Sequence, residues 1–299
     1  MDLPIVVGID GSGPSLRAVD WAADEAALRG APLRLVYASL WDRYEGALLA
    51  QELDKPLEEV MARDVVGAAE ERARRRRPEL RITTDVLPED PEYGLVRESG
   101  TALAVVLGCR GRSGMAEALL GSVSLSVAAH AHCPTIVLRD GPDDRARTGI
   151  RGRIALGVGR NPAGSAGSAA VRFAVEEAAL HGARLEAVRA WRRPGHAGTG
   201  HRPPDFVQPD AQPTGEPAQQ QAVEVLEQAL RDAPAELRVD RRTVEGHARD
   251  ALVAVSREAD LLVVGARRRH AHFGLQLGRV AHGVLHHAAC PVAVVPEPA

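Results

Sequence analysis

A glycine-rich stretch in the first half of the chain has the residue types that can hold a phosphate group. Gly108 and Gly111 follow a short apolar run, and after nine more residues Gly121 and Ser122 open a helical segment. Glycine lets the backbone come close to an anion because it has no Cβ. A helix that begins here offers unpaired N–H groups and a partial positive charge. The stretch therefore suits a polyphosphate, with the alternative that its glycines serve only as turn and cap residues.

Three further side chains could complete such a site. Ser124 adds a second hydroxyl to the first helical turn, where serine can donate to a ligand or cap the helix. Arg110 adds a positive charge within the glycine stretch. Asp10 ends the first apolar run, and a carboxylate there can accept hydrogen bonds from ribose hydroxyls. The alternative for Asp10 is an Asx turn or a cap for the next helix.

Catalytic and metal-binding patterns are weaker. The chain has no Gly-Lys-Ser/Thr phosphate loop and no set of nucleophile, base and orienting residue, so we expect no enzyme activity. His282, His286 and Cys290 are spaced four residues apart and could bind zinc from one helix face. Cys290 precedes Pro291, however, and the first half of the chain has Leu and Ala where these histidines stand. We therefore expect no metal site, and histidines that pack or lie in solvent.

Charge and cysteine content argue against nucleic acid and disulfides. The formal net charge is −3, and the basic run Arg74–Arg77 ends a helical pattern, where cations suit the helix dipole. The three cysteines have no paired spacing, and we expect Cys109 to pack in the interior. The N-terminus has no signal-peptide pattern, and its first apolar run is too short to span a membrane, so we expect a cytoplasmic protein.

The elements that must position these residues alternate between strands and helices. In the first half, we expect strands at Ile5–Ile9, Leu33–Ala38, Leu80–Leu87, Ala104–Leu107 and Thr135–Leu138. We expect helices at Ser15–Arg29, Leu57–Arg77, Tyr93–Glu98 and Ser122–Ala131. This alternation predicts an α/β fold, in which a parallel sheet carries helices on both faces. Ligands of such sheets lie beyond the carboxyl ends of the strands.

The chain repeats itself once. The segment 105–108 matches 262–265, and 128–138 matches 285–295, both at an offset of about 157 residues. We therefore expect two related domains, 1–140 and 152–299, joined by a polar linker. The segment from Arg192 to Pro217 is rich in Pro and Gly, and we expect it to be an inserted mobile loop.

These features together resemble the universal stress protein family in its tandem form. The glycine spacing, the Asp10-Gly11-Ser12 sequence and the late Cys-Pro before an apolar strand all match the family pattern. The resemblance implies two Rossmann-like (adenine nucleotide alpha hydrolase-like) domains, each a parallel five-stranded sheet, and ATP held non-covalently, with or without Mg²⁺. It places the following residues around the nucleotide: Asp10, Ala38, Gly108, Arg110, Gly111, Gly121, Ser122, Val123 and Ser124. It also implies that Thr135–Leu138 pairs with Val292–Val295 as an internal pseudo-dimer, with a further homodimer as an open possibility.

The second copy departs from the family pattern. Gly159 stands in place of the aspartate, Arg268 in place of the second glycine and Arg279 in place of the serine. A long side chain where the backbone must approach phosphate obstructs the usual pose, so we expect ATP in the first domain only. The alternative is that the second copy binds a different anion through Arg267, Arg268, Arg269 and Arg279.

The resulting expectation is a non-enzymatic ATP-binding module of stress response or signalling, with an unidentified protein partner. Two alternatives remain open. One is an enzyme, either a slow ATPase or a nucleotide transferase, although the Asp10-Gly11-Ser12-Gly13 segment lacks the histidine that such transferases use. The other is an interaction module without a ligand.

Overall fold

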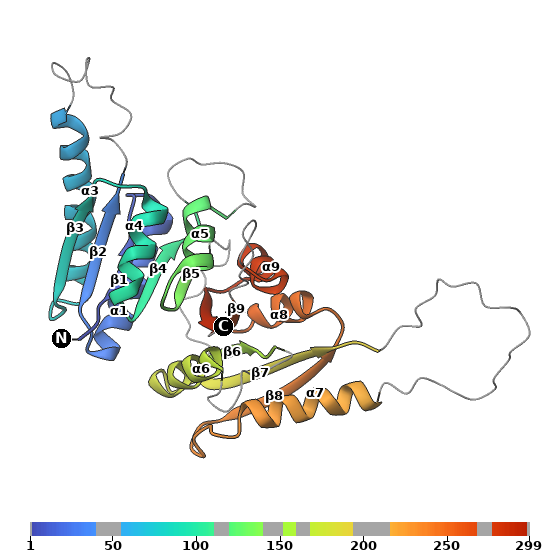
Figure 1. Cartoon of the computed structure of the whole chain (residues 1–299). Coiled ribbons are helices and arrows are strands. Elements are labelled where there is room, and N and C mark those ends of the chain that lie inside the picture. The colour runs from blue at the N-terminus through green and yellow to red at the C-terminus, as the bar shows by residue number, and fades with distance from the viewer. Residues whose placement is uncertain are drawn as a thin grey trace, which may run out of the picture.

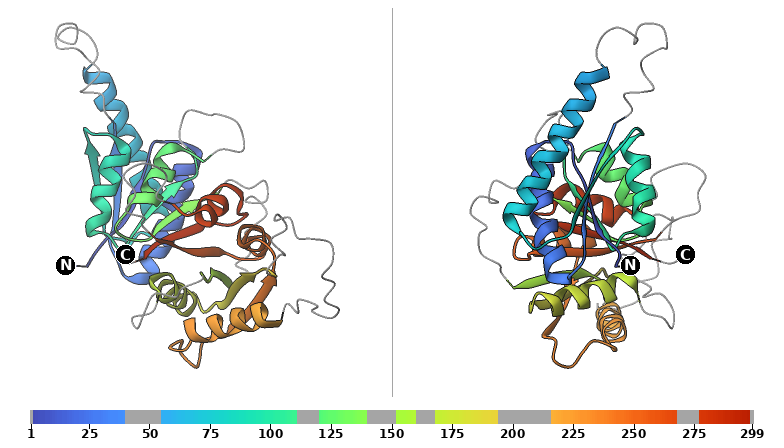
Figure 2. Two further views of the ribbon diagram at one scale, coloured as in Figure 1. Left: turned by 45° about the vertical axis from the view of Figure 1, so that its right-hand side comes forward. Right: turned by 90° about the vertical axis from the view of Figure 1, so that its left-hand side faces the viewer.

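A computed structural model describes residues 2–39, 55–110, 120–139, 152–159, 168–193, 216–267 and 277–297. It has an α/β architecture with a single ten-stranded sheet, and helices cover both faces of that sheet (Figures 1 and 2). The predicted fold class is therefore confirmed. In the described part of the chain, no helix is long and apolar enough to cross a membrane.

The first half of the chain forms five parallel strands in the order β3-β2-β1-β4-β5. The strands are β1 (Ile5–Gly8), β2 (Leu33–Ala38), β3 (Ile82–Leu87), β4 (Ala104–Gly108) and β5 (Thr135–Leu138). The helices are α1 (Gly13–Arg29), α3 (Lys55–Arg76), α4 (Pro91–Glu98) and α5 (Ser122–His130), with a 3-10 turn at Ser99–Thr101. Helix α1 ends where expected, at Gly30, whose φ of 65° is the left-handed conformation that glycine adopts readily.

The second half repeats this plan in the order β10-β9-β6-β7-β8. Its strands are β6 (Arg153–Gly157), β7 (Arg184–Trp191), β8 (Val239–Glu245), β9 (Leu261–Arg267) and β10 (Val292–Glu297). Its helices are α6 (Ala169–Leu180), α7 (Glu216–Ala229), α8 (Ala248–Ser256) and α9 (Arg279–His287). The expected loop at 192–217 lies mostly outside the described residues, and its last two residues open α7.

The two halves join through their last strands. Strand β5 pairs antiparallel with β10, as the family resemblance implies, and Ile136 lies opposite Ala293. All other strand pairs are parallel, so the strands of the two halves run in opposite directions. The carboxyl ends of the strands, where ligands of such sheets bind, therefore lie on opposite edges of the sheet in the two halves. The pairing also covers two strand edges that would otherwise be exposed.

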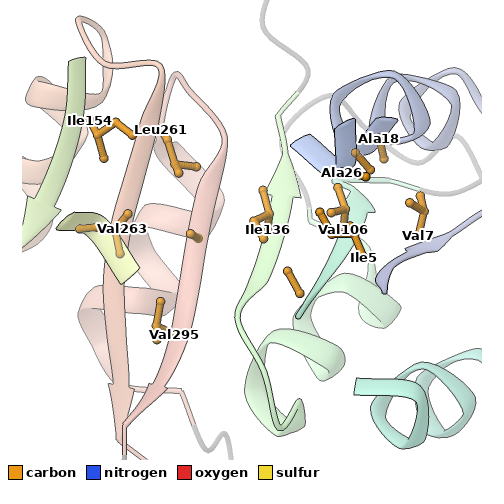
Figure 3. Packing of buried hydrophobic residues seen from close by; sticks show 14 of the residues in the cluster. Ile5, Val7, Ala18, Ala26, Val106, Ile136, Ile154, Leu261, Val263 and Val295 are labelled. Carbon is orange, nitrogen blue, oxygen red and sulfur yellow. The ribbon is translucent and has the colours of Figure 1, made fainter. Parts of the chain in front are cut away.

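Small aliphatic side chains build the core. In Figure 3, Ile5, Val7 and Val106 of the sheet face Ala18 and Ala26 of α1, and all five are buried. The same buried cluster continues across the seam into the second half, where it includes Ile154, Leu261, Val263 and Val295. Burying a Val, Leu or Ile side chain contributes about 1.5–3 kcal/mol. The two halves therefore share one core on this face.

An ion cluster joins α1 to α6 across the halves. The guanidinium of Arg29 contacts the carboxylates of Glu25 and Glu177, and both carboxylates are almost fully buried. The Nε2 atom of His181 lies 2.9 Å from Glu25 and 3.4 Å from Glu177. Hydrogen bonds to Glu177 and then Glu25 raise the pKa of His181 to about 10. One guanidinium and one imidazole thus face the two buried carboxylates, and burial raises the pKa of Glu177.

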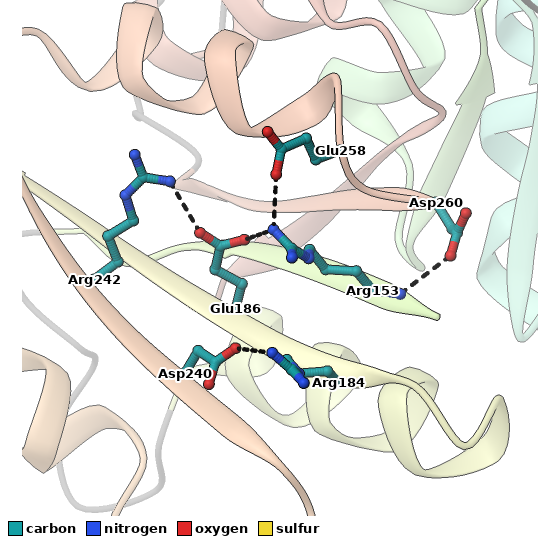
Figure 4. A network of polar contacts seen from close by, with 7 residues as sticks. All are labelled: Arg153, Arg184, Glu186, Asp240, Arg242, Glu258 and Asp260. Carbon is teal, nitrogen blue, oxygen red and sulfur yellow. Dashed lines mark hydrogen bonds and ion pairs between the residues drawn. The ribbon is translucent and has the colours of Figure 1, made fainter. Parts of the chain in front are cut away.

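A second polar network fixes the outer strands of the second half. In Figure 4, the buried carboxylate of Glu186 on β7 accepts from Arg153 on β6 at 3.0 Å and from Arg242 on β8 at 3.2 Å. The backbone N–H of Arg153 also donates to Asp260, just before β9. This network lies at the amino-terminal end of β6 and so away from the edge where a ligand is expected.

Candidate functional site

The predicted site residues of the first half gather at the carboxyl edge of its sheet. Asp10, Ala38 and Gly108 stand at the ends of β1, β2 and β4, and β1 pairs with both of the other strands. Helix α5 begins at Ser122, directly after the glycine stretch. Gly111 lies outside the described residues, so its place in the site stays a prediction. The remaining predicted residues come to the edge at which the fold predicts a ligand.

Helix α5 has an open N-terminus. Its cap residue is Gly121, which has no side chain that could accept from the amides of the first turn. By contrast, α1 and α4, which begin at the same edge, have side-chain caps: Ser12 accepts from Ser15 at the start of α1, and Asp90 accepts from Glu92 at the start of α4. Amides without a cap, together with the helix dipole, make an N-terminus suited to an anion. The exposed side chain of Ser122 adds a hydroxyl at the same point.

Two of the predicted residues in this turn have packing roles. The buried hydroxyl of Ser124 donates a 2.7 Å hydrogen bond to the carbonyl oxygen of Gly108. Val123 is half-buried and packs, like Ala38, against an apolar cluster that includes Leu95 and Val127. Ser124 therefore ties the start of α5 to the end of β4, and its hydroxyl proton is already used. Its backbone amide remains the part of Ser124 that can face a ligand.

Gly108 is required by the packing of α1. A Cβ at this position would lie 2.7 Å from the backbone carbonyl carbon of Pro14, in the first turn of α1. Any other residue would push the helix away from the strand. This close approach holds the start of α1 over the end of β4. This packing role of Gly108 was not predicted from the sequence, and contact with phosphate stays a compatible prediction.

Asp10 forms the Asx turn that was its alternative role. The N–H of Ser12 donates to the Asp10 carboxylate at 2.9 Å, and Gly11 between them has a φ of 79°. The helix cap is Ser12 and not Asp10, because the Ser12 hydroxyl accepts from Ser15. The turn fixes the direction of the half-buried carboxylate at the end of β1. Its contact with a ribose remains a prediction.

The described residues of the second half line a cavity of about 1330 Å³ at the equivalent edge. Ile5 pairs with Leu33 and Ile154 with Leu185, so Ala190 on β7 is the counterpart of Ala38. Ala190 lines the cavity, as do Gly159 and Gly278. This match between Ala190 and Ala38 escaped sequence reasoning, although the offset between the paired strands could have revealed it.

A carboxylate lies beside Gly265 on β9, the counterpart of Gly108. A Cβ on Gly265 would lie 2.8 Å from an Oε1 atom of Glu297, the last residue of β10. Glu297 is held there by Ser168 and by the backbone N–H groups of Ala169 and Ala170, at the start of α6. A phosphate that approached Gly265 would meet this negative charge. This contact was not predicted from the sequence, and it adds a second obstacle to the family pose besides Arg279.

The histidines and cysteines are arranged as follows. The rings of His282 and His286 lie 4.6 Å apart, whereas Cys290 is fully buried beyond the helix end. Among the described residues, one group of three potential ligands lies within 4.8 Å, and it consists of Glu25, Glu177 and His181. Because Arg29 and the imidazolium already balance its charge, we interpret this group as an ion cluster. Cys109 is buried, as expected.

Comparison with known proteins agrees with this geometry. A model of the universal stress protein family matches residues 3–139 and again residues 152–296. Universal stress proteins of Mycolicibacterium smegmatis and Mycobacterium tuberculosis are each 30% identical, over 302 residues (97% of this chain, 96% of the relative) and 316 residues (99% and 96%).

Solved structures show the same fold over the whole chain. A universal stress protein from Archaeoglobus fulgidus superposes with a TM-score of 0.69 at 15% identity, covering 98% of both chains. One from Pseudomonas aeruginosa gives 0.65 at 16% identity, covering 99% of this chain and 94% of that one. The two matches to the family model, each with its own five-stranded half-sheet, show that this chain belongs to the universal stress protein family.

Proposed function

We propose that this protein is an ATP-binding module of stress response or signalling, in which the first half holds one ATP without hydrolysing it. The observation that carries the proposal is the open N-terminus of α5. Its cap is Gly121, and it begins at the edge of the sheet where Asp10 and Ala38 also stand. Anionic groups are stabilised at such a helix start.

The expected pose of ATP follows from the positions of these residues. The phosphates would lie on the amides of Ser122, Val123 and Ser124, with the guanidinium of Arg110 and the glycine stretch around them. The ribose would face Asp10, and the adenine would lie against Ala38. Mg²⁺, where present, would be held mainly by the phosphates.

The second half supports no such pose. Glu297 fills the space next to Gly265, and Arg279 replaces the serine at the helix start. The protein would therefore bind one nucleotide per chain and present a surface to its partner that depends on that nucleotide.

A direct test uses the nucleotide content of the purified protein. The chain is purified without added nucleotide, denatured, and its released small molecules are separated by ion-exchange chromatography. We expect about one adenine nucleotide for each chain, and much less for a Ser122→Arg variant that copies Arg279 into the first half. Absence of nucleotide from the intact protein, together with failure to take up added ATP, would favour a ligand-free interaction module.

The same preparation distinguishes the proposed binding module from an enzyme that hydrolyses ATP. We expect less than one turnover of ATP for each bound molecule over hours. Many turnovers that are lost on changing Asp10→Ala would instead identify a slow ATPase.

A further inference from the structure

The cavity of the second half carries a row of basic side chains. Arg279, His282 and His286 lie at positions i, i+3 and i+7 of α9 and so share one face of this helix, and all three line the cavity. Between them, Gly283 leaves room for the side chain of Arg249 on α8, because a Cβ there would lie 2.6 Å from its Cδ. Arg249 and Arg279 are both exposed, and Arg249 also pairs with the exposed carboxylate of the neighbouring Asp250 at 2.9 Å. The row is thus open to a ligand in solution.

The first half has no such row at the matching positions. Helices α5 and α9 have matching glycine caps, Gly121 and Gly278, and the caps of α4 and α8 match at the same offset. The exchanges from the first to the second half are Glu92 to Arg249, Ser122 to Arg279, Leu125 to His282 and Ala129 to His286. Asp10 is also replaced, by Gly159. These exchanges introduce two arginines and two histidines and remove two carboxylates, whereas Asp250 stands where the first half has Tyr93.

The position of Arg279 is unfavourable for the helix by itself. It is the first residue of α9, where the helix dipole already places a partial positive charge. A cation at this end is repelled by that partial charge. Burial lowers the pKa of the His286 imidazole, and the neighbouring His282 and Arg139 lower it further. A bound anion would stabilise the cation of Arg279 at this helix start.

The rest of the cavity wall limits what the ligand can be. Besides the basic side chains, the cavity is lined by apolar residues that include Val158, Leu252 and Leu277, and by Trp191 at the end of β7. Glu297 closes the approach to Gly265, which favours the α8–α9 side of the cavity for an anion. Arg189 and Arg192, on and after β7, also line the cavity. A ligand with an apolar body and one anionic group would fit both regions.

We propose that the second half binds a small organic phosphate monoester, with its phosphate between Arg249, Arg279 and the amides at the start of α9, and its apolar part against the cavity wall. Arginine forks and helix amides are suited to phosphate oxygens. The two halves of the chain would then sense two different anions from opposite edges of one sheet.

Phenyl phosphate is a suitable probe, because it carries one phosphate on an apolar ring. The full chain is titrated with it while the imidazole resonances are followed by NMR, assigned with His282→Gln and His286→Gln variants. We expect saturable shifts of the His282 and His286 resonances, and at least threefold weaker binding of inorganic phosphate, which lacks the ring. These resonances report on the second half, so the result is independent of whether ATP binds in the first.

The decisive variant restores the residues of the first half. In an Arg249→Glu, Arg279→Ser double variant, we expect the affinity for phenyl phosphate to fall at least tenfold. A control, Arg231→Ser, removes an exposed arginine outside the cavity and should leave the affinity unchanged. Should the double variant unfold, Arg279→Ser alone, a change at an exposed side chain, still tests the proposal. Absence of shifts in the intact protein, or equal affinity in the folded variant, would overturn it.

Discussion

The hydroxyl of Ser124 donates to the carbonyl oxygen of Gly108 over 2.7 Å, and this bond joins the start of α5 to the end of β4. Both partners are buried. Replacing Ser124 with Ala leaves the carbonyl without this donor, at a cost of about 1–3 kcal/mol in the free energy of unfolding. We also expect weaker ATP binding, because the amides of α5 lose their support.

The exposed Ser122 provides the matched control for this prediction. Ser122→Ala should change the free energy of unfolding by less than about 0.5 kcal/mol. Urea unfolding followed by circular dichroism measures both variants. Equal losses of stability in the two would contradict the structural role assigned to Ser124.

Gly108 provides a second test of stability, and Gly67 provides its control. A Cβ at Gly108 would lie 2.7 Å from the Pro14 backbone, whereas a Cβ at Gly67 in α3 would meet nothing within 4 Å. We expect Gly108→Ala to lower the free energy of unfolding by about 1–3 kcal/mol through overpacking. Gly67→Ala should raise it by up to about 1 kcal/mol, because alanine favours the helix. A harmless Gly108→Ala change would show that α1 is not held against β4 in this way.

The sequence predicted the elements better than their contacts. The bounds of β2 and β5 agree with the sequence pattern to the residue, because short apolar runs between turn residues are buried strands. Four starts were wrong by two residues, namely those of α1, α3, β3 and α4. Helix α1 begins at Gly13 because Ser12 caps it, and β3 begins at Ile82 because the N–H of Leu80 closes a turn onto Arg77.

Contacts between distant parts of the chain could not be derived from local patterns. The ion cluster of Glu25 and His181 depends on how α1 packs on α6 across the seam. Likewise, Glu297 reaches Gly265 only because β10 lies beside β9 in a register that no local signal reveals. The glycine spacing predicted the edge of the site, but not that Gly108 would be needed for helix packing.

The His181 cluster predicts that the protein becomes less stable as the pH rises into the alkaline range. Hydrogen bonds to Glu177 and Glu25 raise the pKa of His181 to about 10, above the ordinary value of 6.5. The stabilisation is therefore fully present below about pH 6.5 and is lost as the pH rises through about 10. We expect the wild-type protein to be more stable than His181→Gln at pH 6.5.

Urea unfolding at several pH values between 6.5 and 10 tests this prediction. The difference between the free energies of unfolding of the two proteins should shrink steadily over that range. A difference that stays constant would mean that the imidazole is not protonated in the folded protein.

Arg139 links the two halves by a different contact. It follows β5 of the first half, and its guanidinium donates to the carbonyl oxygens of Leu285 and His286 at 2.7 and 2.8 Å, in the last turn of α9. Arg139→Gln should lower the free energy of unfolding by about 1–3 kcal/mol, because these part-buried bonds involve a charged donor. Thermal unfolding by calorimetry provides the measurement.

Arg75 provides the comparison for Arg139. It forms an exposed ion pair with Glu71 on α3, with 69% of each side chain accessible. Such surface pairs contribute little, so Arg75→Gln should change stability by less than about 0.5 kcal/mol. If Arg139→Gln were as mild as Arg75→Gln, the contact between β5 and α9 would not stabilise the seam.

The most direct test of the central claim is a calorimetric titration of ATP into the full chain and two variants. The account predicts one ATP per chain for the intact protein, loss of binding in Ser122→Arg, and unchanged binding in Arg279→Ser. Two ATP per chain, or loss of binding in Arg279→Ser but not in Ser122→Arg, would contradict the assignment of the nucleotide to the first half. No binding at all would contradict the ATP site itself.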